Sequence, residues 1–331
     1  MYRDGKQLVT SSIHNFVLNQ GALGDVLCSL PAIIQARRTY PILPKMRVWC
    51  PGHQVDLLRH LLAPYGEFEI LDVAGFPMKR VEREGWDGGS VSINQMAFNT
   101  HTRNRVHMVD YAFGCLSDSR PESMLERSYP TLAPLGPRRS DRDYVVIPVG
   151  ATSDNKLFRA SVMGPVMQWC LDNGYVPVVV GTKVSTTMAV SSGAPEPIVI
   201  RDQTEMLPLG LLAHCIDMRE RTTLLELRDV LGHAAAVVGV DGGTLHLAGT
   251  TDVPIVYASG TTLPKHRYIA RYGDAAFRAR YIGPRDLECA GCQSNWTLTS
   301  LDFRFCAYGD SKCMELLHPD DFIAGLKELG L

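Results

Sequence analysis

Short apolar runs alternate with segments of helical periodicity along the first third of the chain. Each predicted strand is a run of mostly apolar residues bounded by turns, and each predicted helix repeats its apolar residues every three or four positions. The predicted strands are 14–19, 46–50 and 68–71, and the predicted helices are 25–39, 55–62 and 107–116. No period persists across 75–106, a stretch rich in Gly, Asn, Arg and Met, as is common in binding loops.

The same alternation restarts after Tyr129–Asp143, a segment with three prolines and clustered charges that is typical of an interdomain linker. Beyond it the predicted strands are 144–148, 176–180, 236–240 and 254–258, and the predicted helices are 161–173, 224–233 and 244–250. Apolar strands that alternate with helices indicate an α/β fold in which helices cover both faces of parallel sheets.

The length of 331 residues exceeds one ordinary core and predicts two domains, which we assign to 1–135 and 136–331. A formal net charge of −2 gives no electrostatic reason to expect a nucleic-acid partner, although it does not exclude one. No apolar run reaches the roughly 20 residues of a transmembrane segment, and the N-terminal residues lack the apolar core of a signal peptide. With nine cysteines, an odd number, these features predict a cytoplasmic protein with reduced thiols.

The first candidate site is the turn Gly21–Asp25, which follows the first predicted strand. Ligands of open parallel sheets bind at the carboxyl ends of strands, so Asp25 would face a crevice there. The alternative is that Asp25 only caps the following helix, since Asp is a favoured N-cap residue.

The second candidate site is the loop Gly150–Lys156, which follows the first strand of the second half. Thr152 could donate a hydroxyl to a phosphate, and Lys156 could place a positive charge on it. The spacing does not match a P-loop, and a solvated polar loop is the alternative.

The third candidate site runs from Val238 to Ala248, where an apolar strand passes through an acid and two glycines into a helix start. Glycines allow a phosphate to approach the N–H groups of a helix N-terminus, and His246 could donate to the same phosphate. In the alternative interpretation, Asp241 is a helix cap and His246 packs near the core.

These three segments, in this order, resemble the ADP-heptose:lipopolysaccharide heptosyltransferases of glycosyltransferase family nine. The matching segments are Asn19–Leu27 with Leu30-Pro31-Ala32, Val146–Lys156 with Phe158, and Gly239–Ala248 with Pro254-Ile255-Val256 and Ser259–Thr262. The last segment is similar to the family's donor-binding motif, Asp-(Ser/Thr)-Gly-x-x-His. Two positions depart from the family pattern: Gly242 replaces the usual Ser or Thr, and Asn19-Gln20 stands where many members carry a basic residue.

The resemblance implies a GT-B fold, with two Rossmann-like domains whose parallel sheets face each other across a cleft. It implies an inverting, metal-independent glycosyltransferase that moves a sugar, heptose by family default, from a nucleotide-diphosphate donor such as ADP-heptose. The acceptor would be a hydroxyl of an anionic glycan or glycolipid, and no cofactor is implied. Such an enzyme would be cytoplasmic, with a peripheral contact to the inner membrane as an option.

The resemblance also assigns roles to residues of this chain. Asp25 would be the general base. The donor ligands would be Thr152, Lys156, Asp241, Gly242, Gly243, Thr244, Leu245 and His246. The acceptor side would include Gly24, Arg103, Arg105 and His107. Two other functions stay open on the same fold: a sugar-nucleotide epimerase or hydrolase, and a non-catalytic protein that binds a nucleotide-sugar.

The C-terminal region adds four cysteines, in which a C-x2-C pair is followed by two single residues. Four thiolates could bind a structural zinc ion, and the alternatives are buried thiols or disulfides. The four are Cys289, Cys292, Cys306 and Cys313. The basic residues between Lys265 and Arg285 could meet an anionic acceptor, with a solvated face as the alternative.

Overall fold

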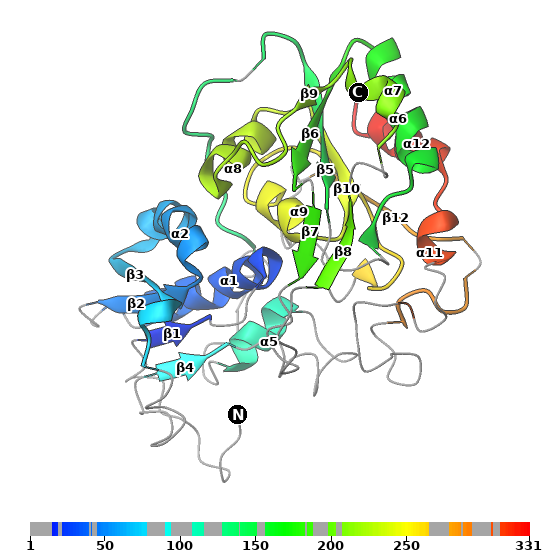
Figure 1. Ribbon diagram of the computed structural model, residues 1–331. Coiled ribbons are helices and arrows are strands. Elements are labelled where there is room, and N and C mark those ends of the chain that lie inside the picture. The colour runs from blue at the N-terminus through cyan, green and yellow to red at the C-terminus, as the bar shows by residue number, and fades with distance from the viewer. Residues whose placement is uncertain are drawn as a thin grey trace. The chain divides into compact units, whose positions relative to one another are not determined.

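The chain divides into two compact units, Met1–Leu132 with Ala270–Asp274 and Ala133–Ile269 with Ala275–Leu331. Each unit contains a parallel sheet with helices packed on it (Figure 1). None of the helices within the described ranges is long and apolar enough to cross a membrane. The computed structural model describes residues 15–18, 22–39, 41, 45–77, 90–93, 108–115, 128–138, 140–150, 156–182, 184–187, 198–202, 207–264, 278–285, 287–292, 306 and 312–331.

The first unit is built on a four-stranded parallel sheet in the order β3-β2-β1-β4. Its elements are β1 (Asn15–Val17), α1 (Leu23–Thr39), β2 (Met46–Cys50), α2 (Val55–Leu62), β3 (Phe68–Asp72), β4 (Ser90–Ser92) and α5 (Met108–Cys115). The apolar faces of α1 and α2 are buried, and α1 packs against α5. Because β2 and β4 lie on opposite sides of β1, the strand order reverses beside β1.

The second unit is built on a six-stranded parallel sheet in the order β12-β11-β10-β5-β6-β9. Its strands are β5 (Tyr144–Val149), β6 (Val176–Gly181), β9 (Ile216–Asp217), β10 (Ala236–Val240), β11 (Ile255–Ala258) and β12 (Ala279–Ile282), with the antiparallel pair β7 (Val184–Thr187) and β8 (Ile198–Asp202) apart from the sheet. Its helices are α6 (Ala160–Asp172), α7 (Leu209–Leu212), α8 (Leu224–Gly232), α9 (Gly243–Ala248), α11 (Lys312–Glu315) and α12 (Pro319–Glu328).

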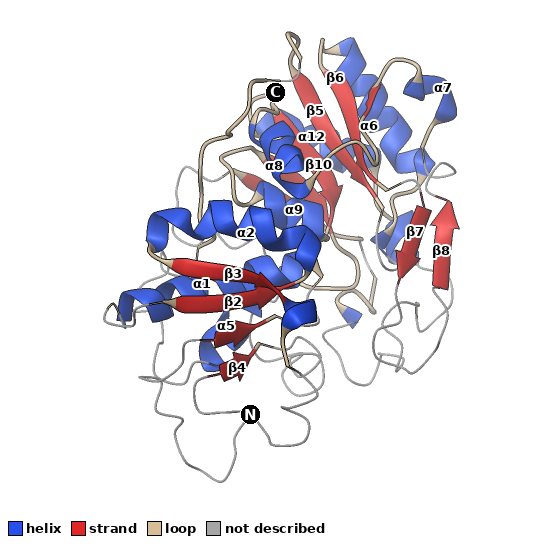
Figure 2. Ribbon diagram, turned by 60° about the vertical axis from the view of Figure 1, so that its left-hand side comes forward, coloured by secondary structure: helices blue, strands red, loops and turns tan. Residues whose placement is uncertain are grey.

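Helices cover both faces of the six-stranded sheet, with α6 and α12 on one face and α8 and α9 on the other (Figures 1 and 2). Apolar side chains of β5, β10 and β11 pack with those of α6 and α12 in one hydrophobic core. Phe158 and Phe322 meet there edge to face, with ring centroids 5.3 Å apart. Burial of this surface is the main stabilising term for the unit.

The chain runs outward from the centre of this sheet in both directions. From β5 it passes to β6 and then β9, whereas from β10 it passes to β11 and then β12. The strand order therefore reverses between β5 and β10, and ligands of open α/β sheets bind beside the carboxyl ends of strands at such a reversal. Lys156 and Asp241, which follow β5 and β10 along the chain, are in contact with each other.

The predicted α/β class with parallel sheets is confirmed, and most predicted elements are confirmed to within two residues at each end. Eight of the described α-helices and strands were not predicted. They are β4, β7, β8, β9, β12, α7, α11 and α12. The helix α12 carried a readable signal, because Pro319 stands at its start and two acidic residues follow in its first turn.

Residues at the division between the two units bind to helix α8 of the second unit. The N–H groups of Leu135 and Gly136 donate to the Asp229 carboxylate, at 2.8 Å and 2.9 Å. His233 Nε2 lies 2.8 Å from the carbonyl oxygen of Gly136. The later part of the proline-rich segment is therefore fixed on the second unit.

Candidate functional site

The third candidate segment forms a tight strand-to-helix turn at the carboxyl end of β10. The N–H of Asp241 still donates to the carbonyl of Ala258 on β11, at 2.8 Å, and α9 begins two residues later. Gly239 lets the helix pack directly on the strand, because a Cβ atom there would lie 2.9 Å from Leu245 Cδ2. The turn is therefore fixed by packing on both sides.

Asp241 is the centre of the site. Its Oδ2 atom accepts a hydrogen bond from Lys156 Nζ at 2.9 Å and another from Thr262 Oγ1 at 3.0 Å. His246 Nε2 lies 3.5 Å from its Oδ1 atom. The side chains of Lys156, Asp241 and His246 are only 15%, 6% and 5% exposed. A carboxylate, an ammonium group and an imidazole thus meet in a place with little water, where their interactions are strong.

The predicted alternative that Asp241 caps α9 is wrong. The N-cap residue is Gly242, in an extended conformation with φ −171°, and no side chain caps the helix. Gly243, Thr244 and Leu245 form the first turn, as predicted for the donor segment. The alternative also predicted that His246 packs near the core. His246 is indeed buried, but its ring faces the Asp241 carboxylate.

The resemblance to the family included Ser259–Thr262, the loop that follows β11, but no single residue of this loop was assigned a role. Thr262 reaches Asp241, and its N–H donates to Ser259 Oγ at 3.2 Å. Tyr281 on β12 donates to the Ser259 carbonyl at 2.7 Å, and its pKa is raised by burial first, then by the charges of Asp241 and Cys313. The signal was a run of hydroxyl residues directly after a buried strand, at the carboxyl edge of the sheet.

Asp25 belongs to the first unit. The helix α1 begins at Leu23, two residues earlier than predicted, and Asp25 is its third residue. The alternative that Asp25 is the N-cap residue of this helix is therefore wrong. Its N–H donates to the carbonyl of Ala22 at 2.9 Å, and its carbonyl accepts from Ser29 Oγ at 3.0 Å. Its half-buried carboxylate follows β1, where the strand order of that sheet reverses. Gly24 beside it is buried.

Several predicted site residues lie outside the described residues. They are Thr152 on the donor side and Arg103, Arg105 and His107 on the acceptor side. Their roles stay predictions.

Three of the C-terminal cysteines, Cys289, Cys292 and Cys306, lie within electrostatic range of the fourth, Cys313. The pKa of the Cys313 thiol is raised to about 12, by burial first and then by the charges of Cys292, Cys306 and Cys289. Among the described side chains, however, no three His, Cys, Asp or Glu are grouped so that they could hold a metal ion.

Three arginines of the predicted basic patch are bound to α12 and the residue after it. Arg278 donates to the Leu329 carbonyl at 2.6 Å, Arg280 pairs with Glu328 at 2.6 Å, and Arg285 pairs with Asp321. These contacts favour a structural role for this part of the patch over recognition of an anionic acceptor.

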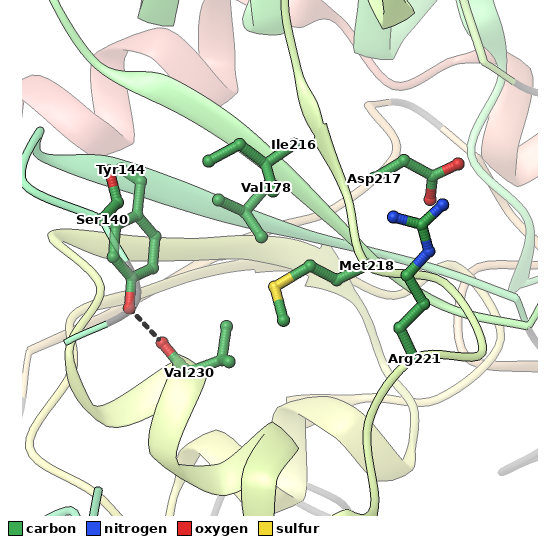
Figure 3. A pocket seen from close by; sticks show the side chains of 8 residues that line it. All are labelled: Ser140, Tyr144, Val178, Ile216, Asp217, Met218, Arg221 and Val230. Atoms are coloured by element: carbon green, nitrogen blue, oxygen red, sulfur yellow. Dashed lines mark hydrogen bonds between the residues drawn. The ribbon is translucent and has the colours of Figure 1, made fainter. Parts of the chain in front are cut away.

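A cavity of about 220 Å³ lies elsewhere in the second unit (Figure 3). Its lining includes Tyr144 and Ile216, the first residues of β5 and β9, so it lies toward the amino ends of those strands. The Tyr144 hydroxyl donates to the Val230 carbonyl at 2.9 Å. The cavity therefore lies at the opposite end of the strands from Lys156 and Asp241, which follow the carboxyl ends of β5 and β10.

Comparisons with solved structures show the fold. The iron-containing dodecameric heptosyltransferase TibC of E. coli, in complex with ADP-D-beta-D-heptose, is 17% identical with TM-score 0.69, covering 99% of this chain and 80% of that one. E. coli ADP-heptose lps heptosyltransferase II is 15% identical with TM-score 0.63, covering 96% and 98%. A family 9 glycosyl transferase from Veillonella parvula is 13% identical with TM-score 0.62, covering 95% and 96%. The predicted GT-B-type class is confirmed by this likeness.

Comparison with curated proteins gave no match. The family model described as glycosyltransferase family 9 (heptosyltransferase) matches residues 110–276, which include Lys156, Asp241, His246 and Thr262. This match spans half of the chain, and the chain therefore belongs to glycosyltransferase family 9 and is a glycosyltransferase.

Proposed function

We propose that this glycosyltransferase transfers a sugar, with inversion, from a nucleotide-diphosphate donor to a hydroxyl of a glycan or glycolipid. The observation that supports this most is the meeting of Lys156, Asp241 and His246 at the strand-order reversal of the second unit. The family match covers the same residues. ADP-heptose is the donor to test first, because it is the ligand named for TibC and the donor named for heptosyltransferase II.

The donor diphosphate would bind to Lys156 and His246. Both side chains can donate hydrogen bonds, and in a site with little water a lysine ammonium stabilises the charge that develops on a leaving diphosphate. Asp241 holds both groups at 2.9 Å and 3.5 Å, so the site is already arranged before the donor arrives. With this charge supplied by side chains, we expect turnover without added Mg²⁺.

Asp25 would act as the general base. The acceptor oxygen forms a bond to the anomeric carbon while the bond from that carbon to the diphosphate oxygen breaks. The acceptor proton passes to the Asp25 carboxylate, and the nucleoside diphosphate leaves. Asp25 lies in the first turn of α1, where the helix dipole favours its ionised form, so it would accept the proton late in the reaction.

A nucleotide-sugar screen tests the proposal. ADP-, UDP-, GDP- and CMP-sugars are added singly, and thermal unfolding is followed, since a ligand that binds the native state raises Tm. We expect one of them to raise Tm in the wild type and to be consumed only when an acceptor is present. Consumption without acceptor would identify an epimerase or hydrolase instead, and binding without turnover on any acceptor would identify a binding protein.

We further propose that the four C-terminal thiols hold a structural metal ion. Soft thiolates favour zinc or iron, and none of the four cysteines forms a disulfide within the described part of the chain. Because they are not grouped as a metal site among the described side chains, a bound ion would have to draw the thiols together. Metal analysis of protein purified without added metal would give about one equivalent of zinc or iron per chain. Less than about a tenth of an equivalent would contradict this assignment.

A further inference from the structure

We propose that Thr262 is a positioning residue for the donor site: its hydroxyl holds the Asp241 carboxylate and so sets the positions of Lys156 and His246. The inference rests on the proposed function, because it concerns how the donor site is kept ready for its diphosphate. It assigns a role to the loop Ser259–Thr262, which follows β11 and would not itself touch the diphosphate.

The contact between Thr262 and Asp241 is a buried hydrogen bond to a charged group. Thr262 Oγ1 donates to Asp241 Oδ2 at 3.0 Å, and both residues are about 5% exposed. A hydrogen bond to a charged group in such surroundings is among the stronger ones in proteins. The same Oδ2 atom accepts from Lys156 Nζ, so one carboxylate oxygen joins the lysine to the loop.

The loop is itself held in place from two sides. Ser259 accepts from the Thr262 N–H through its side chain and from the Tyr281 hydroxyl through its carbonyl. Gly260 lies so close to Cys313 that an added Cβ atom would be 2.3 Å from the Cβ atom of that cysteine. The Gly260 carbonyl also accepts from the Gly291 N–H at 2.8 Å. These contacts fix the conformation of the loop and thereby the position of Thr262 beside Asp241.

The Thr262 hydroxyl affects Lys156 because both groups donate to the same atom, Asp241 Oδ2. A carboxylate with a second donor attracts the ammonium group less strongly and keeps one orientation. Lys156 can then turn its other N–H groups toward a diphosphate. Without the hydroxyl, Asp241 can rotate and hold Lys156 more tightly, and affinity for the donor falls.

The experiment compares Thr262→Val and Thr262→Ser in calorimetric titrations with ADP-heptose. We expect Kd to rise about tenfold in the valine variant, equal to about 1.4 kcal/mol, and to stay within about threefold of wild type in the serine variant. Thr251→Val is the matched control, because Thr251 is equally buried but its hydroxyl donates to the Ala248 carbonyl at 2.7 Å. This control should leave Kd unchanged.

A double-mutant cycle separates positioning from a general structural effect. If Thr262 acts through Asp241, then Thr262→Val adds no further loss of affinity to Asp241→Asn, whereas independent effects would multiply. Multiplying losses, or a valine variant that binds as wild type does, would overturn the inference and leave the proposed function standing. If the wild type bound no nucleotide-sugar, the proposed function would fall and the inference with it.

Discussion

At the residue scale, Gly242 is the position where the donor segment lacks a side chain. It is the N-cap residue of α9, its φ of −171° is open to any residue, and an added Cβ atom would lie 3.5 Å from the Val240 carbonyl, an ordinary contact. Gly242→Ser should therefore cap the helix and raise the free energy of unfolding by a few tenths of a kcal/mol, about the difference between these N-caps. Urea denaturation measures this, with Gly242→Ala as the control without the oxygen. Equal stability of the two variants would contradict it.

The residues of the site were predictable only in part. Asp241 and Lys156 each follow an apolar run that reads as a strand, so the sequence could indicate that both lie at carboxyl ends. That β5 and β10 are neighbours depends on the strand order, which no local pattern encodes. Thr262 lay in a segment that matched the family, but its role was not predicted, because its contact with Asp241 spans 21 residues and depends on the register of β10 and β11.

At the element scale, Arg228 joins α8 to the end of α9 and to the start of the second unit. It is fully buried and donates to the Thr250 hydroxyl at 3.1 Å, the Thr250 carbonyl at 2.9 Å and the Ala133 carbonyl at 3.2 Å. Burial lowers its pKa, while the charges of Asp229 and Asp252 raise it. The position of α9, which carries His246, thus depends partly on this guanidinium group.

Arg228→Met should lower the free energy of unfolding by about 2–4 kcal/mol, because it takes these donors from two buried carbonyls. The exposed Arg221→Met is the matched control and should change stability by less than about 0.5 kcal/mol. Chemical denaturation of both variants checks the prediction. A loss below about 1 kcal/mol for Arg228→Met would show that the guanidinium does not hold α9.

The elements with strong apolar runs were the ones that could be predicted. Strand β10 and helix α2 match their predicted bounds, because each has a clear period and a clear turn on either side. Strands β9 and β12 lie at the two edges of the sheet, and each has polar or partly exposed residues. Their place depends on pairing with neighbouring strands, so their own sequences carry little signal.

At the scale of the whole molecule, the proposed roles fall on separate units. Asp25, the proposed base, belongs to the first unit, while Lys156, Asp241 and His246, the proposed donor site, belong to the second. Each group follows a central strand of its own parallel sheet, at the reversal of strand order. Removing the base should therefore leave donor binding intact, whereas removing the lysine should weaken it.

Calorimetric titration of ADP-heptose into wild type, Asp25→Asn and Lys156→Ala tests this central claim most directly. We expect Asp25→Asn to bind with a Kd within about twofold of wild type while sugar transfer is lost, because its carboxylate serves only the proton transfer. We expect Lys156→Ala to bind at least about tenfold more weakly, since it loses a charge-assisted contact to the diphosphate. Equal donor affinity in wild type and Lys156→Ala would contradict the account.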